Sequence, residues 1–385
     1  MAAHERTVVV LGGAGSVGAE TVRQLSQRDK FSKIIVADRN FEDAQNLAQE
    51  LGAEASEIDV TDKAALSDLI RGSDVVLNTA GPFFLYGTEV IRSAIEARVP
   101  YADVNDEEEP ILELFSTDDI DRAARDAGIP LVVGLGTSPG LTNILTRYGA
   151  QEFDTVDSVQ IALATGPWTR GIAVWSHHLH AHSGQTTIYR NGDWTQVPAM
   201  SEEEIITFPW APGQGQVHIV SHPEPLTLPR FFPGIQEVVF KLGHPENVNR
   251  LYRDLSKYGL TSEASIPYGT SEISPAGFIA AYLATDQADR VFGFSKLTPY
   301  SMREVRIAGR RDGRPLKLRY QVSMKGGPIE SGLPLAITAE LLADGEISAG
   351  LFSPEALDPA PFLRAFPELG ARSRLIREEE PSALA

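Results

Sequence analysis

An apolar run that leads directly into a glycine-rich turn restricts the fold of this chain more than any other feature. Residues 8–11 are uniformly apolar, as expected of a parallel strand buried on both faces. Gly13-x-Gly15-x-x-Gly18 follows at once, and residues 19–25 carry apolar side chains at helical spacing. A strand, a glycine turn and a helix in this order form the context in which such a pattern predicts a dinucleotide site.

The three glycines have separate physical tasks in this prediction. Gly13 permits the tight turn, Gly15 lets a pyrophosphate approach the backbone, and Gly18 lets the helix pack closely on the strand. The first residues of the helix include Ser16 and Val17. Their unpaired N–H groups and the helix dipole would face the phosphates.

A second expected strand, 33–39, carries an acid near its end. Asp38 lies about 20 residues past the motif, where a carboxylate accepts hydrogen bonds from both ribose hydroxyls. The same carboxylate would repel a 2′-phosphate, so Asp38 favours NAD. Arg39 could stack on adenine or pair with a 2′-phosphate, so NADP stays open. Asp59 and Val60, in the next strand, are expected beside the adenine.

Strands and helices alternate through the first third of the chain, which predicts a doubly wound parallel sheet. The expected strands are 7–11, 33–39, 57–62, 74–82, 99–105 and 129–136, and the expected helices are 42–52, 63–71, 87–97 and 116–127. Small residues at the carboxyl end of a central strand suit close approach of a cofactor. These are Thr79, Ala80, Gly81 and Pro82.

The pattern changes after residue 142. Strands are expected at 156–164, 185–190, 205–210, 215–221 and 235–243, with a hairpin over 302–324 and helices at 246–257, 274–286 and 333–344. The predicted fold class is α/β, with an N-terminal Rossmann-type sheet and an inserted α+β domain that has a mixed or antiparallel sheet. The expected domains are 1–142 and 143–330, with a segment 331–385 that packs back on the first domain.

Composition excludes several classes of function. The net charge of −18 argues against nucleic acid and anionic membranes as partners, because both need basic surface. The absence of cysteine excludes disulfides and thiolate metal sites, and it fits a cytoplasmic protein. No apolar run reaches the ~20 residues needed to span a bilayer.

Several stretches, in order along the chain, resemble the saccharopine dehydrogenase-like family in its two-domain reductase form. They are the glycine motif at 12–18, Asn-Thr-Ala-Gly-Pro-Phe-Phe-Leu-Tyr-Gly at 78–87, Tyr101-Ala102-Asp103 with Glu107, Gly-Thr-Ser-Pro-Gly at 136–140, and segments 332–336, 343–345 and 353–355. The resemblance implies hydride transfer between NAD(P) and the carbon of an amine or imine, usually on an amino acid. It also implies a homodimer assembled through the second domain.

The nicotinamide is expected at the carboxyl ends of the central strands, next to Gly136 and Ser138. Relatives often carry Asp where this chain has Ser138, so an acid that would pair with a substrate ammonium is missing there. Tyr86 is the candidate for relaying a proton, and Asp103 for a base or ammonium partner. Packing explains the tyrosine equally well, and a loop cap explains the acid equally well.

Further candidates for substrate contact are polar residues at strand ends and in the second domain. Asn105 and Asn143 are candidates near the cofactor, and Arg230 would bind a carboxylate bidentately. Within a histidine-rich segment at 177–182, His178 is a candidate catalytic residue that faces the substrate and His180 a candidate for substrate binding.

On a strand, His178, His180 and His182 would share one face, which raises the question of a metal site. No acid or cysteine in the neighbouring sequence supports one, so no metal is predicted.

The leading hypothesis is an NAD(P)-dependent oxidoreductase that acts on a C–N bond of a small molecule. A carbonyl or enoyl reductase on the same scaffold is the second enzyme hypothesis. A regulator that senses the dinucleotide, without a substrate pocket, is the non-enzymatic alternative.

Overall fold

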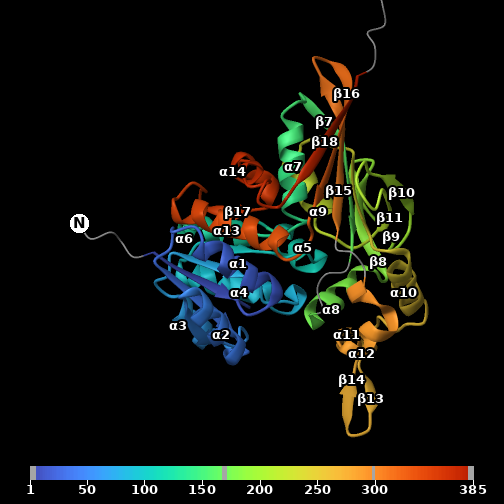
Figure 1. Cartoon of the computed structure of the whole chain (residues 1–385). Coiled ribbons are helices and arrows are strands. Elements are labelled where there is room, and N and C mark those ends of the chain that lie inside the picture. Colours follow the sequence, from blue (N-terminus) through green and yellow to red (C-terminus); the bar gives the residue numbers. More distant parts are fainter. Residues whose placement is uncertain (1–5, 167–170, 297–299, 380–385) are drawn as a thin grey trace, which may run out of the picture. The chain divides into compact units, whose positions relative to one another are not determined.

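The computed structural model of the protein describes residues 6–166, 171–296 and 300–379 (Figure 1). The chain divides into two compact units. The first contains Met1–Ile144 and Pro328–Leu363, and the second contains Leu145–Gly327 and Arg364–Ala385.

The first unit is built on a seven-stranded sheet in which neighbouring strands run parallel. Its strands are β1 (Thr7–Leu11), β2 (Lys33–Asp38), β3 (Glu54–Glu57), β4 (Val75–Asn78), β5 (Tyr101–Asp103), β6 (Pro130–Val132) and β17 (Gly350–Phe352). Their order is β17-β6-β5-β4-β1-β2-β3, a Rossmann-type order with one further strand at the β6 edge. This confirms the predicted fold class of the first domain.

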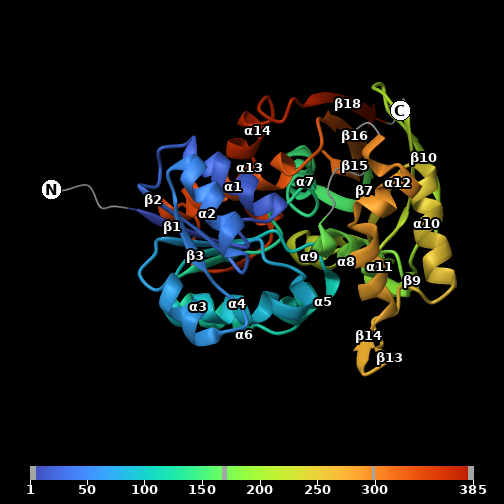
Figure 2. The ribbon, with the colours of Figure 1, turned by 60° about the horizontal axis from the view of Figure 1, so that its bottom comes forward.

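Helices cover both faces of this sheet. They are α1 (Ser16–Ser26), α2 (Phe41–Leu51), α3 (Lys63–Ile70), α4 (Phe83–Ala97), α5 (Glu108–Ser116), α6 (Asp119–Ala127), the start of α7 (Leu141–Ala150), α13 (Ile329–Ala343) and most of α14 (Ala360–Arg364). Figure 2 shows α1, α2 and α13 on one face and α3, α4 and α6 on the other. The predicted single helix at 116–127 is wrong in its start, because α5 ends at Ser116 and α6 begins at Asp119.

A nine-stranded sheet forms the centre of the second unit. Its strands are β7 (Thr155–Thr165), β8 (Gln185–Arg190), β9 (Asp193–Pro198), β10 (Glu204–Thr207), β11 (Gln214–Ile219), β12 (Glu237–Gly243), β15 (Ser301–Arg311), β16 (Arg314–Met324) and β18 (Arg372–Glu379). β7 and β12 run parallel, and the other pairs of described strands in this sheet run antiparallel. The mixed sheet confirms the predicted class of the inserted domain.

Two tight turns of this sheet follow directly from local sequence. Asn191 and Gly192 join β8 to β9, and Asp312 and Gly313 join β15 to β16. All four residues have positive φ, between 50° and 79°. Asn, Asp and Gly tolerate this conformation, and its twist suits a two-residue hairpin.

The carboxyl-terminal segment divides between the units instead of packing as one piece. α13 and β17 belong to the first unit, whereas β18 pairs along β16 in the second. Since β16 is eleven residues long and otherwise ends the sheet, its free edge offers backbone groups that β18 satisfies.

Helices of the second unit pack together in an apolar cluster. They are α8 (Ile172–Ala181), α10 (Glu246–Lys257), α11 (Pro275–Leu283) and α12 (Asp286–Phe292). A further helix, α9 (Glu224–Phe231), packs on β12 and β8, and a short hairpin of β13 (Ile266–Tyr268) and β14 (Ser271–Ile273) precedes α11. Trp175, Leu179, Tyr252 and Leu283 are central to the cluster formed by α8, α10, α11 and α12.

The predicted helix at 274–286 is two helices. Thr285 caps the second, its hydroxyl accepting from the Ala288 N–H at 3.2 Å, and this cap separates α11 from α12. No helix among the described residues has the length and apolar character needed to cross a membrane.

The contact between α1 and α13 depends on a glycine, which gives a stability prediction. A Cβ on Gly332 of α13 would lie 2.9 Å from Glu20 Cγ and from Thr21 N of α1. Gly332→Ala should therefore destabilise the first unit by about 1–3 kcal/mol in thermal or urea unfolding. Gly87→Ala, in α4, is the matched control, because the atoms nearest to its Cβ would belong to the Phe83 side chain and lie 3.4 Å or more away. Equal stability of the two variants would contradict the predicted close approach.

Candidate functional site

The glycine turn of the first unit is packed tightly everywhere except at Gly15. A Cβ on Gly13 would lie 2.8 Å from Val10 O, and one on Gly18 would lie 2.7 Å from Thr79 Oγ1. A Cβ on Gly15 would meet only Gly12 O, at 3.2 Å. The protein's own packing therefore requires Gly13 and Gly18, whereas Gly15 leaves backbone accessible for a ligand, as a pyrophosphate site needs.

Gly12 is a further essential glycine that the three-glycine pattern omits. Its φ is +69°, and a Cβ would lie 2.7 Å from Ala80 N. The turn thus packs directly on the loop after β4. The adjacent pair Gly12-Gly13 is the sequence signal that could have identified it.

The start of α1 fits a phosphate group. Its N-cap residue is Gly15, which offers no side-chain cap, and the first turn carries no acid. Ser16 and Val17 belong to this first turn. The first N–H groups of a helix lack intrahelical partners, so they and the helix dipole are directed at an anion.

Asp38 ends β2 next to the glycine turn, as the spacing predicts. Its carboxylate accepts from Ala14 N at 3.0 Å and from Asn40 N at 2.9 Å. Arg39 beside it is exposed. The acid therefore fixes the turn in addition to lying where ribose hydroxyls are bound in such folds.

The predicted strand at 57–62 is wrong in its bounds, because β3, the edge strand next to β2, ends at Glu57 and Asp59 and Val60 lie in the turn after it. Asp59 is exposed and accepts from the Thr61 N–H at 2.9 Å and the Thr61 hydroxyl at 2.7 Å. These two hydrogen bonds lower the pKa of Asp59, and the charge of Arg39 lowers it further. Val60 is half-buried.

The loop after β4 is bonded to the glycine turn. The Thr79 hydroxyl donates to Leu11 O at 2.8 Å and to Gly12 O at 3.0 Å, and Ala80 N donates to Asn78 Oδ1 at 3.0 Å. Gly81 and Pro82 complete the loop and lead into α4. Residues 79–82 thus lie against the same turn as the expected phosphate site.

A buried network around Asp103 joins the ends of three strands. Asp103 Oδ1 accepts from Asn105 N at 3.0 Å and from Gly134 N at 2.8 Å, and Oδ2 accepts from the Tyr101 hydroxyl at 3.0 Å. Asn78 Nδ2 donates to the same Tyr101 oxygen at 3.0 Å. The network connects β4, β5 and the residues that follow β6.

Asp103 is fully buried, and its surroundings are protein donors. Burial raises its pKa to about 6, while the backbone and tyrosine donors act in the opposite direction. This geometry favours a role in holding the strand ends together. A direct contact of Asp103 with substrate stays a prediction.

Asn105 has a donor that the protein does not use. It is 1% exposed, its Oδ1 accepts from Glu107 N at 3.0 Å, and its Nδ2 lacks a hydrogen-bond partner among the described residues. Buried donors without partners are rare in native proteins. Asn105 Nδ2 is therefore suited to an acceptor on a bound molecule.

The turn after β6 is tied to distant parts of the same unit. Gly136 N donates to Pro139 O at 2.8 Å, and the Ser138 hydroxyl lies 2.8 Å from the Thr142 hydroxyl. Asn143 Oδ1 accepts from Gly140 N at 3.1 Å, and its Nδ2 donates to Glu355 Oε2 at 2.8 Å. Asn143 thus holds the turn in place, and its partner, more than 200 residues away, has no local sequence signal.

The histidine-rich segment is a helix, so the conditional strand interpretation is wrong. Trp175 and Leu179, four residues apart, point into the apolar cluster, and this spacing is helical. His178 and His182 therefore share a face, and His180 does not. Histidines two residues apart in sequence occur in strands and in helices, so their spacing alone does not distinguish the two. The spacing of the neighbouring apolar residues Trp175 and Leu179 does.

The half-buried His178 and the buried His182 lie in a larger group of rings within the second unit. Their ring centroids are 5.8 Å apart, and that of His244, after β12, lies 4.8 Å from His178 and 5.5 Å from His182. The Tyr252 hydroxyl lies 3.0 Å from His178 Nδ1, and His182 Nδ1 donates to the His178 carbonyl at 2.7 Å. Burial, reinforced by the neighbouring histidines, lowers the pKa of His178, His182 and His244 well below the usual range.

Arg230 lies in the last turn of α9. Its guanidinium stacks on Trp194, with Cζ 4.9 Å from the ring centroid, and donates to the Leu226 carbonyl. Burial lowers its pKa. Its predicted contact with a substrate carboxylate stays a prediction.

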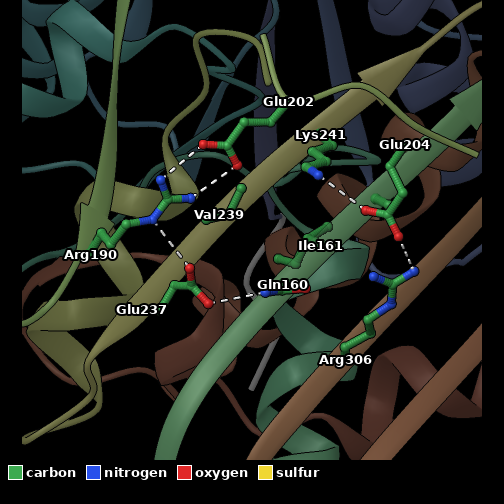
Figure 3. A pocket seen from close by; sticks show the side chains of 10 residues that line it. Gln160, Ile161, Arg190, Glu202, Glu204, Glu237, Val239, Lys241 and Arg306 are labelled. Atoms are coloured by element: carbon green, nitrogen blue, oxygen red, sulfur yellow. Dashed lines mark hydrogen bonds and ion pairs between the residues drawn. The ribbon is translucent and has the colours of Figure 1, made fainter. Parts of the chain in front are cut away.

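A small cavity on the second sheet is lined by charges that neutralise one another (Figure 3). Its volume is about 110 Å³, and its lining includes three acids and three bases. The Arg190 guanidinium donates to Glu202 at 2.9 and 3.0 Å and to Glu237 at 3.3 Å, while Glu204 pairs with Lys241 and Arg306. The cavity is smaller than typical ligand pockets of about 300–1,000 Å³, and its charges are used internally.

The buried histidines predict that acid destabilises the second unit. Their folded-state pKa values lie below the unfolded value of about 6.5, so the unfolded chain binds more protons as the pH falls below that value. Each histidine that stays neutral in the folded state should cost about 1.4 kcal/mol per pH unit below ~6.5. All four tryptophans fall within residues 145–327, so urea unfolding followed by tryptophan fluorescence at pH 7.5 and 5.5 reports on this unit.

His182→Asn should weaken this pH dependence, whereas His180→Asn, which alters a half-buried side chain outside the ring group, should preserve it. An unchanged unfolding midpoint between pH 7.5 and 5.5 in the wild-type protein would contradict the prediction.

Comparison with known proteins agrees with this geometry. Residues 8–132 match the saccharopine dehydrogenase NADP binding domain. Over 94% of its length the chain is 23% identical to carboxyaminopropylagmatine dehydrogenase of Synechocystis sp., covering 96% of that protein. It is 22% identical to carboxynorspermidine synthase of Vibrio alginolyticus, over 93% of this chain and 94% of that one.

Among solved structures, apo saccharopine dehydrogenase (L-Glu forming) from Saccharomyces cerevisiae has the same fold. The TM-score is 0.68 at 17% sequence identity, covering 96% of this chain and 100% of that one. The resemblance seen in the sequence motifs is thus confirmed in both units. Residues 8–132 therefore match the NADP binding domain of saccharopine dehydrogenase, and the chain as a whole has the fold of the yeast enzyme.

Proposed function

We propose that the protein is an NAD(P)-dependent dehydrogenase or reductase that transfers hydride at the C–N bond of an amino acid-like amine or imine. The observation that carries this proposal is the carboxyl edge of the first sheet. Three features of the first unit could bind a ligand there. They are the accessible backbone at Gly15, the uncapped start of α1 and the Asn105 Nδ2 donor without a partner among the described residues. The relatives that align over almost the whole chain are named for carboxylated amine compounds.

The residues of the chain fit a nicotinamide dinucleotide. The first N–H groups of α1 would bind the phosphates, and Asp38 would accept from the ribose hydroxyls. Loop residues 79–82, Gly136 and Ser138 would lie beside the nicotinamide. The coenzyme, when bound, supplies the hydride acceptor or donor.

The chain must then orient the substrate and move one proton. In the oxidative direction, hydride leaves the carbon that bears the amine and a proton leaves the nitrogen, which produces an imine. Tyr86, half-buried in the first turn of α4, is proposed as the group that relays this proton. Asn105 would donate to a substrate or carboxamide oxygen, and Asp103 would hold both strand ends in register.

The second unit is proposed to supply further substrate contacts. His178, neutral at pH 7 because of its lowered pKa, could accept a proton, while His180 and Arg230 would contact polar groups of the substrate. We also propose a homodimer assembled through the second unit, a cytoplasmic location and no nucleic-acid partner. The proposed absence of a nucleic-acid partner agrees with the net charge of −18.

Turnover of a substrate panel tests the proposed reaction. Amino acids, carboxyalkyl amines and imines should change the absorbance of NAD(P)H at about 340 nm. Tyr86→Phe should reduce kcat by about 10²–10⁴-fold if the hydroxyl relays the proton, with little effect on cofactor affinity.

Turnover of ketones or enones alone would favour a carbonyl or enoyl reductase. Cofactor binding without turnover of any class would favour the dinucleotide-sensing alternative.

Substitution at Asp38 tests the cofactor preference. Asp38→Ala should weaken NAD more than NADP, because the carboxylate accepts from the ribose hydroxyls of NAD but repels a 2′-phosphate. Asp38→Asn is the control, since its amide oxygen can still accept from Ala14 N and hold the turn. Both affinities can be measured by the fluorescence of bound reduced cofactor. An NAD affinity that Asp38→Ala leaves unchanged would refute the assignment.

A further inference from the structure

The helix that carries Tyr86 begins without a cap of its own. α4 starts after Pro82, which forms no side-chain cap, and its first turn contains no acid. The first N–H groups of such a helix need acceptors from elsewhere. Tyr86 lies in this first turn, so whatever holds the turn also determines where the phenol points.

Glu107 supplies the missing acceptor. Its Oε2 accepts from Phe84 N at 2.5 Å, across 23 residues of sequence. Glu107 occupies the N-cap position of α5, yet its side chain forms no cap bond with that helix. It is 3% exposed. A carboxylate at the positive end of the α4 dipole is also electrostatically favourable.

The backbone of Glu107 is itself held by the network at the strand ends. Glu107 N donates to Asn105 Oδ1 at 3.0 Å, and Asn105 N donates to Asp103 Oδ1 at 3.0 Å. A continuous path of hydrogen bonds therefore runs from β5 to the first turn of α4. The path is contained within the first unit.

We propose that Glu107 is a positioning residue that sets the place of Tyr86 by capping α4. This inference rests on the proposed function, in which Tyr86 relays a proton. Glu107 acts through the helix turn, because its side-chain oxygen is the acceptor for Phe84 N.

Two measurements test the positioning without any substrate. Amide hydrogen exchange in residues 84–87 should speed up by about tenfold or more in Glu107→Ala, because an anchoring hydrogen bond is lost. In protein labelled with 3-fluorotyrosine, the ¹⁹F resonance of Tyr86, assigned by its loss in Tyr86→Phe, should shift or broaden in Glu107→Ala. Glu107→Gln keeps an acceptor and should restore both signals.

Glu113→Ala is the matched control. Glu113 also links α5 to α4, accepting from the Thr88 hydroxyl at 3.0 Å, but it is exposed and lies a turn further along α4. It should leave the Tyr86 resonance unchanged. A Tyr86 resonance that is identical in Glu107→Ala and wild type would overturn the proposal.

A double-mutant cycle provides the kinetic test with the substrate found in the panel. Glu107→Ala should lower kcat by about 10–100-fold in the wild-type background, with KM for the cofactor little changed. In the Tyr86→Phe background it should cost less than about twofold, because the group it positions is already absent. Equal costs in both backgrounds would overturn the inference. If no substrate is turned over, the proposed function fails, while the exchange and ¹⁹F measurements still decide the role of Glu107.

Discussion

The carboxyl edge of the first sheet depends on one buried carboxylate. Asp103 places a charge where solvent does not reach, and two backbone N–H groups and a tyrosine hydroxyl offset part of the desolvation cost. Since these donors come from residues on β5 and after β6, the carboxylate can be satisfied only when the strand ends are in register. Asn105 and Glu107 then continue the bonding to α4. The positions of the candidate site residues after β5 and at the start of α4 therefore depend on the correct pairing of β5 with β6.

The second unit follows a different electrostatic principle. The imidazoles of His178 in α8, of His182 at its C-terminal end and of His244 lie around Tyr252, and burial and their mutual repulsion lower their pKa values. The charged side chains of its sheet instead form mutual ion pairs around a small cavity. Neither arrangement presents uncompensated charge for a large ionic ligand. The first unit, which combines an uncapped helix start with an unused buried donor, is the better candidate for anion and cofactor binding.

Local sequence was sufficient where the backbone itself decides the structure. The glycine motif, the strand-helix alternation and the hairpin at Asp312-Gly313 were predictable, because φ preference and hydrophobic periodicity act over a few residues. The histidine segment was ambiguous, because polar residues two apart suit a strand while Trp175 and Leu179 suit a helix. The pairing of Asn143 with Glu355 and the capping of α4 by Glu107 were not predictable, since side-chain partners distant in sequence leave no periodic signal.

The sequence by itself determined the dinucleotide-binding architecture, because buried parallel strands and a glycine-rich turn followed by a helix can be recognised from residue types alone. It also determined the acid at the end of β2, through its distance from the turn. Only the tertiary structure decided that Asp103 is an internal support, that Asn105 keeps an unused donor and that the last strand joins the second sheet. The physical reason is that burial and hydrogen-bond satisfaction depend on every group that surrounds an atom, most of which come from elsewhere in the chain.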